Sequence, residues 1–199
     1  MAVPGKYTIS AAKYIEGEYT SIGEPVTFDT EPLGLGALPP QDKAEVLAFQ
    51  KKTAELQRAV MGAAAAAAEA RERIGAIKQA IFNTPELGPD YTERARALEL
   101  QLMDVSEEIS GDPTKPRRAE PAPPSIMDRV QNIVSGHWST TYGPTRTHLR
   151  DYEIAAQAFG TVLEKLRTLV EVDLRKLEED LEAAGAPWTP GRGVPVWKR

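Results

Sequence analysis

Apolar and small residues recur at alternating steps of three and four through the central part of the chain. Between residues 42 and 83 they form one seam, whose members are Val46, Phe49, Thr53, Leu56, Val60, Ala63, Ala67, Ala70, Ile74, Ile77 and Ile81. This heptad spacing predicts a single helix about 60 Å long, which is stable only if other helices pack along its whole length. Alanine fills the middle of the seam, so we expect a partner helix to approach closely there.

The same spacing predicts three further helices. One follows Pro89 and carries the seam Tyr91, Ala95, Leu98, Leu102, Val105 and Ile109. A short helix is capped by Ser125, presents Ile126, Met127, Val130, Ile133 and Val134, and is expected to end near Gly136. The last begins at Pro144 and ends at Gly185, and one extra step of four near residue 170 interrupts its heptads. The proline-rich stretch 111–124 predicts an extended linker.

Both ends of the chain follow different patterns. Residues 4–29 alternate between apolar and polar side chains, which predicts two or three β strands. An isolated hairpin is marginal in water, so we expect these strands to lie on a surface. Residues 30–41 are a Pro/Gly connector, and residues 186–199 form an extended tail in which Trp188 and Trp197 stand among prolines and glycines.

These patterns predict a mainly α fold. It is an elongated antiparallel helical bundle of two long and two shorter helices, with a small N-terminal β hairpin. The expected regions are the hairpin and connector at 1–41, the helical bundle at 42–185 with its linker at 111–124, and the Trp/Pro tail at 186–199.

Composition argues against several classes of partner and site. The net charge is −5, from 24 basic and 29 acidic residues spread along the chain, which argues against nucleic acid. The absence of cysteine excludes thiolate chemistry and disulfides. No apolar run approaches the length of a membrane span, and no signal peptide is visible. The location therefore stays open: the chain is cytoplasmic as written, or it lacks an original N-terminus.

One polar and aromatic segment carries candidate chemistry. Residues His137, Trp138, Tyr142, Arg146 and His148 could form a small binding loop, with arginine for a carboxylate or phosphate and an aromatic wall. The alternative is structural: Trp138 and Tyr142 close the end of the bundle, while threonine and histidine side chains satisfy the free N–H groups of the last helix. Two histidines without a nearby carboxylate are a poor metal site, and we expect no metal or cofactor.

The charged pairs are interpreted as surface features. Glu107–Glu108 and Glu178–Glu179 are adjacent on helices and point about 100° apart, so neither pair can face one glycosidic bond, and we expect all four to be solvated. Glu69–Arg73 and Glu171–Arg175 have the spacing of outward ion pairs. We predict no catalytic residue.

Three stretches carry a resemblance to a known family: PGKYTI with the later EPVTFDTEP, then GPTRTHLRDYEIA, and above all EAAGAPWTPGRGVPVWK. Together they resemble the C-terminal portion of large bacterial proteins built around a sortilin-like, BNR-repeat β-propeller, often labelled glycosyl hydrolases. The resemblance implies a propeller, an immunoglobulin-like domain ending in strands like residues 4–29, and a helical region with a WTPGR-type tail. It also implies export. The propeller and most of the β domain are outside this sequence, so no catalytic role is carried over.

The expected function is a non-catalytic structural or interaction module, accessory to a β-propeller protein. Its partner would be the propeller or immunoglobulin-like portion of a related protein, contacted through Val26, Phe28, Trp188, Val196 and Trp197. The tail would strap either the chain's own bundle or that partner, and the hairpin edges could accept a partner strand. The alternatives are a coiled-coil scaffold that self-assembles through its seams, and a fragment of a glycosyl hydrolase-like enzyme.

Overall fold

A computed structural model of the chain describes residues 3–32, 42–140, 142–195 and 197. A β hairpin precedes a series of helices. In chain order the elements are β1 (Gly5–Ile15), β2 (Glu18–Thr30), α1 (Lys43–Phe82), α2 (Pro89–Ser110), α3 (Thr114–Arg117), α4 (Ile126–Ser139), α5 (Arg146–Arg167), the π-helix η1 (Thr168–Leu174) and α6 (Arg175–Ala183). The predicted class is confirmed: the fold is mainly α, with a two-stranded antiparallel hairpin at the N-terminus.

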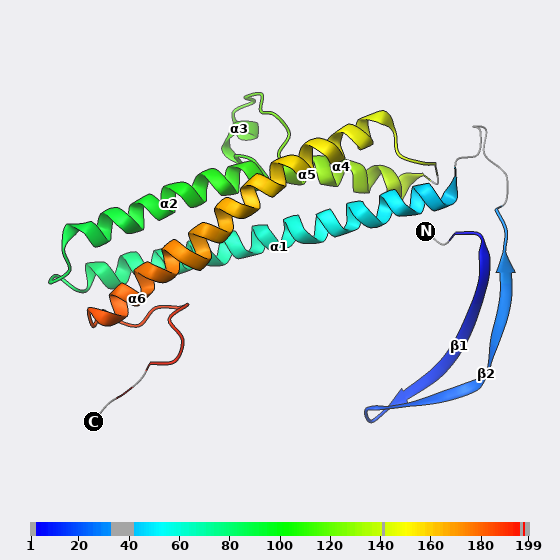
Figure 1. Cartoon of the computed structure of the whole chain (residues 1–199), viewed down its shortest axis with the longest axis horizontal. Helices are drawn as coiled ribbons and strands as arrows, with labels where there is room; N and C mark the ends of the chain where they lie inside the picture. The colour runs from blue at the N-terminus through cyan, green and yellow to red at the C-terminus, as the bar shows by residue number, and fades with distance from the viewer. Residues whose placement is uncertain (1–2, 33–41, 141, 196, 198–199) are drawn as a thin grey trace.

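Two long helical rods run the length of the bundle (Figure 1). One is α1, and the other is the continuous rod formed by α5, η1 and α6. Helices α2 and α4 lie one after the other along these rods, and each contacts both α1 and α5. The two rods are therefore packed against α2 along one part of the bundle and against α4 along the other.

The predicted seams form the core. On α1 every predicted seam position is buried except Ile81, which is half-buried, and Ala80 is buried beside it. On α2 the buried residues are the predicted ones from Ala95 to Ile109. The seams bury one another within one chain, so an assembly that pairs them between copies would first have to open the bundle.

The interruption predicted near residue 170 is a π-helix. Buried residues of the last rod are three or four positions apart until Leu169, and the next buried residue is Leu174, five positions later. A π-turn accommodates one residue more than an α-turn, so η1 absorbs this extra residue. The buried stripe therefore continues into α6 on the same side of the rod.

Helix α4 ends later than predicted. The sequence places its end near Gly136, but the helix continues to Ser139. A Cβ atom on Gly136 would collide with Cε1 of His148, so this glycine makes room for a ring from α5. It is a site of close helix packing and not a helix end. The linker at 111–124 also differs from the prediction, because it contains the single turn α3.

Candidate functional site

The hairpin has one apolar and one polar face. Side chains alternate along a strand, so directly opposed residues share a face. The opposed pairs Tyr7–Phe28, Ile9–Val26 and Ala11–Ile22 form one face, which we call the apolar face. The pairs between them, including Thr8–Thr27 with hydroxyl oxygens 3.1 Å apart, form the polar face. Away from its turn the hairpin thus has the pattern of a sheet in a β-sandwich, apolar inward and polar outward. Near the turn the pattern breaks, because Lys13 and Thr20 follow on the apolar face, and the rings of Tyr14 and Tyr19 lie together on the polar face.

Two backbone features shape the hairpin. Glu16 and Gly17 make its turn with φ angles of 53° and 90°, the positive values that a tight two-residue turn needs. Midway along the strands Ser10 faces the three residues 23–25, where Gly23 has a φ of 73°. This bulge coincides with the strong curvature of the ribbon in Figure 1.

The apolar face is open to solvent. Ile9 is 60% exposed and Val26 is 65% exposed, while Phe28 and Ile22 are also exposed. The only half-buried strand residues are Tyr7 and Thr30, so the hairpin does not lie on another surface of the described chain, and the expectation that a surface covers it stays a prediction about a partner. A sheet face with this composition is a candidate interaction surface.

The tail turns back onto the bundle through its WTPGR motif. The amide of Arg192 donates to the carbonyl of Thr189 at 3.3 Å, with Pro190 and Gly191 between them, and Gly191 has a φ of 98°. This is the arrangement of a type II turn, which prefers proline second and glycine third. A Cβ on Gly191 would lie 2.5 Å from Oε1 of Glu178, so the turn presses directly on α6.

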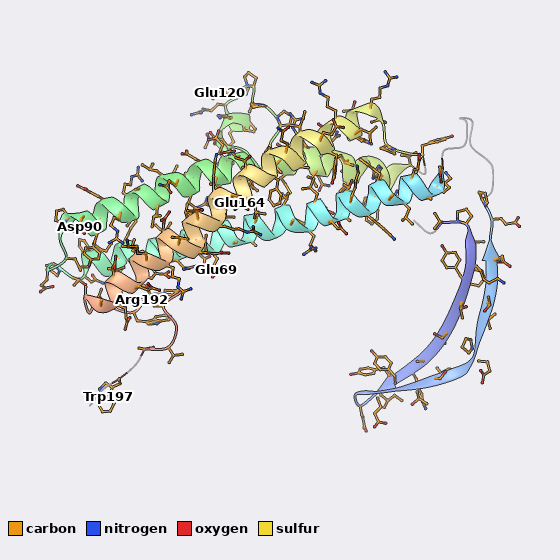
Figure 2. The ribbon with its side chains drawn as sticks, viewed as in Figure 1. Glu69, Asp90, Glu120, Glu164, Arg192 and Trp197 are labelled. Atoms are coloured by element: carbon orange, nitrogen blue, oxygen red, sulfur yellow. The ribbon has the colours of Figure 1, made fainter. Side chains whose placement is uncertain are left out.

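The tail is held against the bundle by Arg192 and not by its tryptophans. The side chain of Arg192 is 3% exposed, pairs with Glu182 and donates to the carbonyls of Ala186 and Pro187. Trp188 is about half exposed, with its indole Nε1 donating to the carbonyl of Gly193 at 2.6 Å, and Trp197 is 77% exposed. Figure 2 shows Trp197 projecting from the end of the chain. The tail therefore straps its own bundle, as one of the two predictions has it, but Arg192 and the turn hold it there, and contact of the two tryptophans with a partner stays a prediction.

The predicted contact residues are thus at the surface where they are described. Val26 and Phe28 are on the apolar face of the hairpin, and Trp188 and Trp197 are on the tail. Val196 lies outside the described residues.

Beneath the tail lies a buried ion pair that the sequence analysis missed. Nε and Nη2 of Arg73 each donate to a carboxylate oxygen of Glu178 at 2.8 Å; the Glu178 side chain is buried, and that of Arg73 is 13% exposed. The hydrogen bond from Arg73 to Glu178 raises the pKa of Arg73. Glu178 is therefore not solvated, and Arg73 is paired across the bundle and not with Glu69 as an outward pair. Similarly, Arg175 pairs with Glu179 and not with Glu171.

The loop residues predicted as a ligand site do not converge as a group. The rings of His137 and His148 are in edge contact, with 5.5 Å between their centroids. The His137 ring also contacts the edge of Phe49, with 5.4 Å between centroids. Trp138 is 87% exposed, so it does not close the end of the bundle, and Tyr142 is half-buried. Arg146 is exposed in the first turn of α5.

The structural alternative for this segment is confirmed in one respect. The Thr145 hydroxyl accepts from the His148 amide, and Nδ1 of His148 accepts from the Thr145 amide. This reciprocal capping box begins α5. Threonine and histidine side chains therefore satisfy free N–H groups at the start of the helix.

The histidine contact predicts a pH-dependent stability. Burial lowers the pKa of His137 below its ordinary 6.5, and the neighbouring His148 lowers it further. As the pH decreases below about 6.5, the unfolded chain gains a proton at this position before the native chain does. The free energy of unfolding therefore decreases as the pH decreases below that value, and this histidine does not affect it at higher pH. The melting temperature should fall by a few degrees between about pH 7.5 and pH 5.5, measured by circular dichroism.

The matched variant is His137→Gln, which removes the titrating group. Its melting temperature should fall less over the same pH range than that of the unchanged chain. Equal pH slopes for the two proteins would contradict a role for His137.

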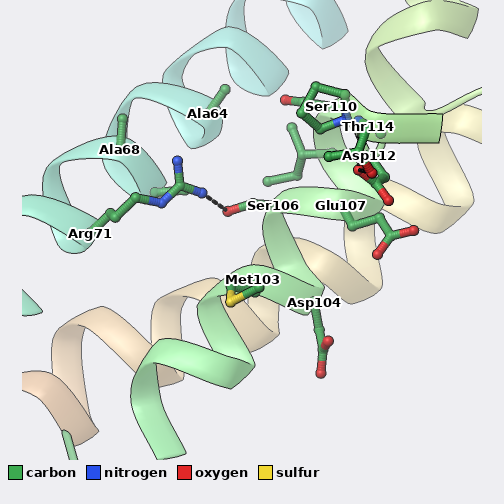
Figure 3. A pocket seen from close by; sticks show the side chains of 14 residues that line it. Ala64, Ala68, Arg71, Met103, Asp104, Ser106, Glu107, Ser110, Asp112 and Thr114 are labelled. Atoms are coloured by element: carbon green, nitrogen blue, oxygen red, sulfur yellow. Dashed lines mark hydrogen bonds between the residues drawn. The ribbon is translucent and has the colours of Figure 1, made fainter. Parts of the chain in front are cut away.

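A half-open hollow of about 560 Å³ lies between α1 and the end of α2 (Figure 3). Ala64 and Ala68 line one side, and Met103 lines another. Two of its charged side chains have partners within the chain: Arg71 donates to the Ser106 hydroxyl at 3.2 Å, and Glu107 pairs with Lys115. This hollow follows from the small side chains of the alanine run and from links between helices.

Within the described ranges, no cluster of three or more His, Asp and Glu side chains is arranged to hold a metal ion. Among the described helices, none combines the length and hydropathy of a membrane span. Comparison of the sequence and the fold with protein-family models, curated proteins and solved structures gave no match.

Proposed function

We propose that this chain is a non-catalytic interaction module, in which a helical rod carries a β hairpin that docks on the sheet of a partner. The observation that carries the proposal is the exposed apolar face of the hairpin. Two strands alone are marginally stable, and apolar side chains such as Ile9 and Val26 gain free energy when another layer covers them.

The pattern of the hairpin identifies the kind of partner. Away from the turn one face is apolar, with Ile9 opposite Val26, and the other carries the opposed hydroxyls of Thr8 and Thr27. A second sheet packing about 10 Å away covers one face and leaves the other in water, as in a β-sandwich. We therefore propose an incomplete β-sandwich as the partner. The resemblance of residues 4–29 and of the tail favours the immunoglobulin-like portion of a β-propeller protein.

The test is complementation of a shortened β domain. The probe is an immunoglobulin-like domain from a sortilin-like β-propeller protein, made without its last two strands. The full chain should bind it in a one-to-one complex, measured by calorimetry. The double variant Ile9→Lys/Val26→Lys should weaken binding by about 100-fold or more, because two apolar side chains lose their buried environment.

The matched control is Thr8→Lys/Thr27→Lys on the polar face. This pair is also directly opposed and exposed, so it adds the same charge to the same two strands. Its binding should stay within a few-fold of the unchanged chain. Equal losses for the two double variants, or no complex with the unchanged chain, would contradict the proposal.

A further inference from the structure

The two outer edges of the hairpin are not equivalent. β1 runs from Gly5 to Ile15 without a proline, and its residues are exposed apart from Tyr7. β2 contains the bulge at residues 23–25, which includes Pro25. Proline has no N–H to donate, and a bulge turns an edge away from a straight partner. An added strand can therefore align along the whole of β1 but not along the whole of β2.

The sequence of β1 is complementary to itself. Ser10 is its middle residue, and an antiparallel copy centred on Ser10 would pair all the residues of the strand. In that register Lys6 is opposite Tyr14 of the second copy, and Tyr7 is opposite Lys13. Each residue and its partner are equally far from Ser10, so they lie on the same face of the joined sheet, and Ile9 is opposite Ala11 of the second copy on the apolar face.

We propose that β1 pairs with β1 of a second copy in this register, giving a four-stranded sheet in a two-fold symmetric dimer. Like charges directly opposed across strands are unfavourable, and here each lysine meets a tyrosine ring instead. An isolated sheet needs at least three strands with an apolar face to be stable in water, and the dimer would have four. A one-residue slip would place apolar side chains on the polar face, and a two-residue slip would lose strand overlap.

This inference goes beyond the proposed function, because it concerns the edge of β1 and not the apolar face. The four-stranded sheet leaves the apolar face open for a partner. Variants on the apolar face test the proposed function, and variants at the edge test the dimer, so either idea can fail alone.

Cysteine crosslinking tests the register. The chain has no cysteine of its own, so Ser10→Cys in the full chain introduces a single thiol. Directly opposed residues in antiparallel strands have Cα atoms about 4.5–5.5 Å apart, within the range that a disulfide spans. The matched control is Ser21→Cys, on the neighbouring strand β2 opposite Ala12.

Mild oxidation should convert most of the Ser10→Cys chain to a disulfide-linked dimer and leave the Ser21→Cys chain largely monomeric on non-reducing gels. Crosslinking of Ser10→Cys no faster than that of Ser21→Cys would overturn the proposal.

Sedimentation equilibrium provides the second measurement. The unchanged chain should show a mass that rises with concentration from one copy to two. Ser10→Lys places two ammonium groups directly opposite each other and should weaken the dimer by about fivefold or more, whereas Ser21→Lys should leave it unchanged. A monomer mass for the unchanged chain at every concentration, or equal effects of the two lysines, would overturn the proposal.

Discussion

Replacing Arg73 by methionine should lower the free energy of unfolding by about 3–5 kcal/mol. The change leaves the Glu178 carboxylate buried against α1 without its two hydrogen bonds from the guanidinium. A buried charge without a partner keeps its full cost of leaving water, so the loss exceeds the net value of the pair itself. Urea unfolding followed by circular dichroism measures the change.

Two controls separate the unpaired charge from other effects. Arg73→Met/Glu178→Leu removes both charges and should recover most of the lost stability, because an apolar pair can replace a buried ion pair at little cost. Arg175→Met breaks the exposed pair with Glu179 and should cost no more than about 1 kcal/mol. If Arg73→Met were as mild as Arg175→Met, the pair would not be buried as described.

Deleting Gln157 should destabilise the bundle far more than deleting Val172, although both side chains are exposed. Residues of an α-helix are about 100° apart around its axis. Loss of Gln157 from α5 turns the following stretch by that angle and moves Phe159, Val162 and Leu166 out of the core. The expected cost exceeds about 4 kcal/mol, or the chain fails to fold.

Loss of Val172 has the opposite consequence. Val172 lies in η1 between the buried residues Leu169 and Leu174, and its removal shortens their separation from five positions to four. The π-turn can then become an ordinary α-turn with both neighbouring stripes still facing the core. The free energy of unfolding should change by about 1 kcal/mol or less. Equal losses from the two deletions would show that η1 does not absorb an extra residue.

The helical core was predictable because burial repeats with the period of the helix. The residues from Val46 to Ile77 on α1, and from Ala95 to Ile109 on α2, are buried as the spacing predicts. The interruption near residue 170 was visible for the same reason. Its form was not visible, since one extra residue can be absorbed by a π-turn or by a change in supercoiling.

Contacts between charged residues were not predictable from spacing. Arg73 has Glu69 four residues away on its own helix, which suggests a local pair. The rotation of α1 against α6 instead places Arg73 beside Glu178, which follows directly on the core residue Leu177. The position of Glu178 next to the seam residue Leu177 was the only feature of the sequence that indicated a buried carboxylate.

The residues that hold the tail on the bundle were not predictable, because aromatic residues usually anchor a strap. Here a buried arginine and a glycine turn hold it, while Trp188 and Trp197 remain largely at the surface. The motif WTPGR was distinctive, but the sequence did not show that its glycine would meet an ion pair from two distant helices.

The arrangement of the two rods also determines how the bundle melts. Because α1 and α5 each contact both α2 and α4, neither half of the molecule has a core of its own. Opening at one end removes packing from helices that the other end shares, so the whole bundle should behave as a single cooperative unit. Hydrogens of backbone amides in the middle of α1 should then exchange with solvent only when the entire bundle unfolds. A mechanical force applied at residue 43 would be transmitted along α1 to the turn after Phe82.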